Sequence, residues 1–161
     1  MPEQKKYPKI EDKINDVLDG EKQKNALNFI AFLKTNEFLL VEHDEYGYGW
    51  SIEYKGQSFA FVKIPGEEKE LWIWAGDVFN TECSADDDFN NFIWSNVVIC
   101  PQSTCPSKRH CGCEQNACGT IFGKEFDSTC YSPLGFFNPD AKTLENVKKL
   151  MLFFKQNRVA A

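Results

Sequence analysis

The spacing of apolar residues at the start of the chain predicts two helices. Between residues 10 and 18 they recur at intervals of three and four, as on one face of a helix: Ile10, Ile14, Val17 and Leu18. Gly20 interrupts this pattern, which then resumes between residues 21 and 34. Because the apolar faces of two such helices need cover, we expect a helical hairpin that packs on a sheet or on itself.

After residue 37 the pattern changes to short runs rich in aromatic and β-branched residues. These runs predict four strands, at about 37–43, 49–55, 58–64 and 70–75. The turn at 55–57, Lys-Gly-Gln, predicts a hairpin between the second and third strands. The segments SFAFVKI and LWIWA carry apolar residues at both parities, so we expect these two strands to be central and covered on both faces.

The rest of the chain predicts two more helices around a cysteine-rich loop. The acids at 86–88 can cap a third helix in FNNFIWSNVVI, and TIFGKEFDSTC is typical of a short strand or an extended segment. Asp140 can cap a terminal helix with the apolar stripe Leu144, Val147, Leu150, Met151 and Phe154. We therefore expect one α+β domain over residues 1–161. Its antiparallel sheet has four to five strands, the N-terminal hairpin and C-terminal helix pack on one face, and residues 100–120 form an inserted loop.

Composition and charge narrow the function classes. The chain has 161 residues, of which 42% are hydrophobic and 26% charged, as in a globular protein. Its net charge of −6 argues against a nucleic-acid partner, since such proteins neutralise phosphates with Lys and Arg. The polar N-terminus lacks the features of a signal peptide, and no apolar run approaches the length of a membrane span. We expect a cytoplasmic protein with no membrane partner, where thiols stay reduced.

The segment CPQSTCPSKRHCGCEQNAC places five cysteines between residues 100 and 118, and Cys130 follows. A loop with so few apolar side chains cannot build its own core, and a tetrahedral zinc site would order it. Binding of a structural zinc is worth about 10–16 kcal/mol, against about 2–4 kcal/mol for a disulfide. Cys100 and Cys130 bracket the loop, so the predicted ligands are Cys100, Cys105, Cys130 and one of Cys111 or Cys113. Unligated thiols and disulfides are the alternatives, and the absence of any CxxC pair weakens the zinc signature.

A redox role is the second hypothesis for the loop. Lys108, Arg109 and His110 precede Cys111, and cationic neighbours lower the pKa of a thiol. Cys111 could then react, with Cys113 or Cys118 as the resolving thiol. A solvated loop tip is the commoner role of such a basic run.

Two further clusters could bind or react. His43-Asp44-Glu45 could seat a metal or act in acid–base catalysis, which makes a metal-dependent enzyme a third hypothesis, although such runs are more often charged turns. Trp50 and Tyr54 share one strand face, and Trp72 and Trp74 share another. If these faces coincide, the four rings form an aromatic floor for a flat or apolar ligand; otherwise they belong to the core.

Two stretches carry a resemblance. YKGQSFAFVKI and LWIWAGD after paired helices resemble small bacterial α+β proteins of uncharacterised function, some of them grouped with YdhG-like domains. The cysteines before IFGKEFDSTC, together with NPDAKTLENVKKL, resemble a family of small proteins from anaerobic bacteria. That resemblance implies a pattern at Cys100, Cys105, Cys111 and Cys130 and no activity. The favoured prediction is a non-enzymatic domain that binds a small molecule or a protein and holds a structural zinc.

Overall fold

The computed structural model describes residues 9–43, 49–76, 78–99 and 117–158. The described helices are α1 (Ile10–Val17), α2 (Gly20–Thr35), α3 (Asp87–Ser95) and α4 (Ala141–Arg158). The described strands are β1 (Leu39–His43), β2 (Gly49–Tyr54), β3 (Gln57–Lys63), β4 (Trp72–Ala75), β5 (Val97–Ile99), β6 (Ala117–Ile121) and β7 (Lys124–Phe137). None of the described helices is long and apolar enough to cross a membrane.

The strands form one antiparallel sheet. Their order is β1-β2-β3-β4-β7-β5, and β6 pairs with β7 beside this path. The α+β class is confirmed, and the described sheet has seven strands rather than the expected four to five. The difference lies in β5, β6 and β7, all in the second half of the chain.

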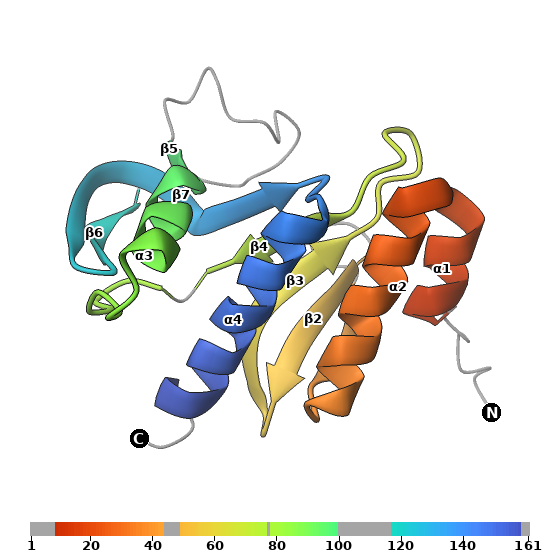
Figure 1. The fold of residues 1–161 in the computed structure, drawn as a ribbon, viewed down its shortest axis with the longest axis horizontal. Helices are drawn as coiled ribbons and strands as arrows, with labels where there is room; N and C mark the ends of the chain where they lie inside the picture. The colour runs from red at the N-terminus through yellow and green to blue at the C-terminus, as the bar shows by residue number, and fades with distance from the viewer. Residues whose placement is uncertain (1–8, 44–48, 77, 100–116, 159–161) are drawn as a thin grey trace.

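The helices lie on one face of the sheet, with α2 and α4 side by side across β2 and β3 (Figure 1). The residues beneath them follow from the register: Trp50 pairs with Val62, Val62 with Ile73, and Ile73 with Phe136, all buried. Phe136 stacks on Phe92 of α3 with ring centroids 5.6 Å apart, which places α3 over the same face.

A chain of phenylalanine rings runs through this core from β3 to β7. Successive ring centroids are 5.0 to 6.4 Å apart along Phe59, Phe154, Phe153, Phe122, Phe89, Phe92 and Phe136. Tilted and offset contacts at these distances stabilise aromatic pairs beyond the area that they bury. Half of the 14 phenylalanines thus hold α3, α4 and the sheet together.

Several expectations about local structure are confirmed. The β2–β3 hairpin turns at Lys55 and Gly56, whose φ angles of 48° and 80° are those of a two-residue hairpin turn. Asp86 accepts a hydrogen bond from the backbone N–H of Phe89, and Asp140 accepts one from that of Thr143, so both expected caps form.

In the second half one expectation was wrong and another was incomplete. The third helix ends at Ser95, and Val97–Ile99 forms the edge strand β5 instead of a last helical turn. The expected short strand in TIFGKEFDSTC is in fact a hairpin. The segment contains the end of β6, the turn and the start of β7, and β7 continues to Phe137. Strand β7 contains Pro133 and Gly135, although proline and glycine commonly interrupt strands. Pro133 has no N–H to donate, and β7 accommodates it because the β5–β7 register is irregular there, between Val97 and Ile99.

The β6–β7 turn enters the core instead of facing solvent. Phe122 is fully buried although its φ angle is 48°, and Gly123 follows at 81°. Thr81 anchors both residues: its Oγ accepts from the N–H of Phe122 at 2.8 Å, and its carbonyl accepts from Gly123 at 3.0 Å. A bulky residue in the left-handed region is strained, so burial of the Phe122 ring must offset this strain.

Candidate functional site

The sheet face that points away from the helices carries a group of aromatic side chains. We call it the open face, because no described helix packs on it. The register places two adjacent rows there. One row is Val41, Ser51, Phe61, Trp74 and Gly135, and the next is His43, Gly49, Lys63, Trp72 and Phe137. We expected β3 and β4 to be covered on this face as well, but Phe61, Trp72, Trp74 and Phe137 are all half-exposed.

Two glycines let phenyl rings lie flat on this face. A Cβ atom at Gly49 would lie 2.6 Å from Cζ of Phe61, so the ring occupies the space above Gly49. In the same way, a Cβ atom at Gly135 would lie 2.9 Å from Cε2 of Phe137. An aromatic ring over a glycine in a neighbouring row shields the exposed backbone of the sheet. Each glycine is therefore buried and leaves the space that a ring occupies.

Phe137 joins the two tryptophans into one cluster. Its ring centroid lies 4.8 Å from that of Trp74 and 5.5 Å from that of Trp72, both edge to face. The indole N–H of Trp72 donates to Oε2 of Glu70 at 2.9 Å, which fixes that ring further. The cluster is thus held in place before any ligand arrives, which lowers the entropic cost of binding.

Polar groups border the rings. Nε2 of His43 and Oγ of Ser51 share a hydrogen bond of 2.7 Å, and the His43 ring lies 6.1 Å from that of Phe61. Nζ of Lys63 lies 5.8 Å from the Phe61 centroid, and partial burial lowers the pKa of this ammonium below its ordinary value. The open face therefore offers apolar area with a cation and an imidazole at its edge.

The expected aromatic floor of four rings does not form as one surface. Trp50 is buried beneath the helices, and Tyr54 lies 5.8 Å from Phe38 and beneath Nζ of Lys155 in α4. Trp72 and Trp74 lie on the opposite face. The correction follows from register, which pairs Trp50 with Val62 and Trp74 with Phe61. Sequence reasoning missed Phe61 and Phe137, although each lies two residues from another open-face residue on its own strand.

The predicted zinc ligands Cys100, Cys105, Cys111 and Cys113 lie outside the described residues, and so does the side chain of Cys130. Cys83 and Cys118 are described, and both are exposed and free. Within the described ranges, no group of three or more His, Cys, Asp and Glu side chains could hold a metal ion. Asp44 and Glu45, the acids expected beside His43, also lie outside the described residues.

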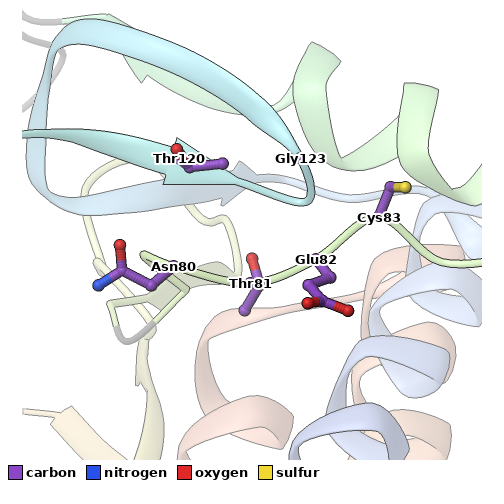
Figure 2. A pocket seen from close by; sticks show the side chains of 6 residues that line it. All are labelled: Asn80, Thr81, Glu82, Cys83, Thr120 and Gly123. Carbon is purple, nitrogen blue, oxygen red and sulfur yellow. The ribbon is translucent and has the colours of Figure 1, made fainter.

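A shallow depression of about 500 Å³ lies beside the β6–β7 turn and is lined by Asn80, Thr81, Glu82, Cys83, Thr120 and Gly123. Figure 2 shows Asn80 and Cys83 at opposite ends, with Glu82 turned away from Thr120. The hydroxyl of Thr81 is already engaged, since it donates to the carbonyl of Val78 at 2.6 Å. Because the polar groups do not converge, the depression is a weaker candidate than the open face.

Comparison with known proteins adds no relative to this picture: no family model matches the chain, and neither the curated proteins nor the solved structures contain a match.

Proposed function

We propose that this protein is a non-enzymatic binding domain whose open face binds a flat, apolar small molecule. The observation that carries the proposal is the half-exposed cluster of Phe61, Trp72, Trp74 and Phe137 on a face without a described helix. Large aromatic rings that could have been buried under a helix are instead held at the surface by Gly49, Gly135 and Glu70. Apolar side chains that gather on one face and remain partly exposed are typical of binding sites.

The chemistry of the face favours binding over catalysis. The described polar groups at the rings are Lys63, the hydrogen-bonded His43–Ser51 pair, and Glu70, whose carboxylate accepts from the Trp72 indole. Ser51 is only 3% exposed and lies in the middle of a strand, where an attacking hydroxyl would have no access to substrate. A ring-shaped ligand would stack on the aromatic cluster, and an acidic substituent would be attracted to Lys63.

Calorimetric titration with planar aromatic compounds tests the proposal, with each compound supplied as a neutral and an anionic form. Replacing Trp74 by Ala should weaken the binding of any compound found by roughly tenfold, because a stacking partner is lost. Trp94→Ala is the matched control, because Trp94 is also half-buried but belongs to α3 and donates to the carbonyl of Ile121. Equal losses in the two variants, or no binding across the compound set, would overturn the proposal.

We also propose that a zinc ion orders the cysteine-rich segment, with Cys100, Cys105, Cys130 and one of Cys111 or Cys113 as ligands. The support is the number and spacing of these thiols in a stretch with few apolar residues. Elemental analysis of protein purified anaerobically should find about one zinc per chain. With seven cysteines in the chain, four ligands leave about three for rapid thiol titration. Protein without metal and with every thiol reactive would exclude this site.

A further inference from the structure

β1 ends the sheet on one side, and its outer edge has no strand beside it among the described residues. Its inner edge pairs with β2 over five consecutive residues, from Leu39 to His43, without a register shift. A free strand edge presents alternating N–H and C=O groups, and these bind a further strand with the same geometry as the sheet itself. The backbone of β1 therefore specifies the shape of its partner, which must be extended.

The other end of the sheet is a much poorer template. β5 has three residues, and its register with β7 is shifted between Val97 and Ile99. β6, which also pairs with β7, is shifted between Ala117 and Gly119. Short edge strands, bulges, lysine and proline are the usual means by which proteins prevent pairing at an edge. β1, with the sequence LLVEH, has a continuous register and neither Lys nor Pro.

The side chains of β1 select among possible strands. Leu39 is 62% exposed and Val41 is 38% exposed, and they are the two most exposed large hydrophobic residues of the described chain. They lie two positions apart on the same sheet face, so an added strand would place apolar side chains beside them at alternate positions.

The charges around β1 favour a basic partner. Glu42 lies within β1 on the face opposite Leu39 and Val41, to which the residues between the apolar positions of an added strand would point. Glu37 precedes the strand with a largely exposed side chain, and its Oε2 lies 3.9 Å from Nζ of Lys155. The whole chain carries a net charge of −6, so two copies of it would repel each other. A strand with Lys or Arg at the positions between its apolar residues would instead be attracted.

We propose that the outer edge of β1 binds an extended segment of another protein as an additional strand, with apolar residues at alternate positions and Lys or Arg between them. The segment pairs with the backbone of Leu39–His43, its apolar side chains contact Leu39 and Val41, and its basic side chains lie near Glu42. The strand added here pairs with the backbone edge of β1, whereas the proposed small molecule stacks on the aromatic rings; Val41 belongs to both surfaces, and protection of the β1 amides distinguishes the two kinds of binding.

The probe is a capped peptide of about seven residues that alternates valine and lysine, which matches the length of an ordinary strand. Its affinity for the full chain is measured by fluorescence anisotropy, and its position by hydrogen exchange of the β1 amides. We expect the peptide to slow exchange in β1 and to bind the Val41→Lys variant at least roughly tenfold more weakly, since an edge lysine removes an apolar contact and repels the peptide. Added salt should weaken binding, because part of the attraction is between exposed charges.

Gln156→Lys is the matched control, because Gln156 is exposed on α4 and the substitution changes the net charge by the same amount. This variant should bind the peptide almost as the original chain does. If Val41→Lys fails to fold by circular dichroism, Val41→Thr keeps a β-branched strand former and should still weaken binding several-fold.

Equal affinities for the two lysine variants, or protection of amides outside β1, would overturn the proposal. A wild-type chain that sediments as a dimer and becomes monomeric with Val41→Lys would also overturn it, in favour of a second copy at this edge.

Discussion

Replacing Gly49 by Ala tests whether the Phe61 ring is held by the space above this glycine. The φ angle of Gly49 is one that other residues adopt, so the expected cost comes from crowding. The new Cβ would lie 2.6 Å from Cζ of Phe61 and 2.6 Å from the carbonyl oxygen of Val62. The ring can move away, but the carbonyl belongs to the central strand β3 and cannot. Overpacking of this kind costs about 1–3 kcal/mol of unfolding free energy.

Gly66→Ala provides the matched control, because no atom lies within 4 Å of a Cβ at Gly66 and its φ is not positive. That substitution should leave the stability unchanged or raise it by up to about 1 kcal/mol, since alanine restricts the unfolded chain. Denaturant unfolding followed by fluorescence measures both variants. Equal unfolding free energies for the two variants would refute the reasoning.

A double-mutant cycle with Phe61→Ala separates the ring from the carbonyl. Without the ring, Gly49→Ala should cost less than in the wild-type chain, by roughly 0.5–1.5 kcal/mol, and the remainder reports the contact with Val62. Effects that add within about 0.5 kcal/mol would mean that the ring does not occupy the space above Gly49. Both variants should also weaken any ligand of the open face, because each removes the Phe61 ring from its position.

Two further predictions concern the core and the helical hairpin. Phe122→Ala should lower the unfolding free energy by about 3–5 kcal/mol, because a fully buried ring is lost. Phe122→Gly should lower it by roughly 1 kcal/mol less, because glycine adopts the left-handed φ angle without strain. Denaturant unfolding measures both variants, and a larger loss for the glycine variant would contradict this. Burial raises the pKa of Glu11, but the hydrogen bond from Lys34, a backbone hydrogen bond and the charges of Lys34 and Lys9 together lower it by more, so the net pKa lies below the ordinary 4.5. The stabilisation by ionised Glu11 is therefore complete above pH 4.5 and is lost as the pH falls through the lowered pKa. Glu11→Gln should remove this pH-dependent stabilisation. A difference in unfolding free energy between the wild-type chain and Glu11→Gln that stays constant from about pH 6 to pH 3 would argue against this role of Glu11.

The helices, their caps and the β2–β3 hairpin could be predicted because their signals are local. The helical spacing around Ile14 and Ile30 is regular, and Lys55-Gly56 turns the chain directly between two strands that pair with each other. The caps Asp86 and Asp140 act within three residues of their own position. Each of these features depends only on residues that are close together in the sequence, so the sequence alone predicts it.

The second half depends on partners that are distant in the sequence. β7 pairs with β4, β5 and β6 at once, and its Pro133 and Gly135 are tolerated only because the neighbouring strands accommodate them. Gly135 leaves the space that Phe137 fills, a reason that appears only when the side chains are placed. The aromatic site could be predicted only in part. That Trp72 and Trp74 share one face of their strand follows from their spacing, but which faces of neighbouring strands coincide depends on the register of the sheet.

The position of α4 has a consequence for the nascent chain. Phe154 stacks on Phe59 with ring centroids 5.6 Å apart, so the last helix of the chain covers a strand made almost a hundred residues earlier. Until α4 has been synthesised, the β2–β3 hairpin displays apolar side chains on both faces, and hairpins in that condition associate with one another. We therefore expect truncation before residue 141 to yield aggregates instead of a smaller folded protein. The eighteen residues of α4 therefore protect the β2–β3 hairpin from association once they pack on it.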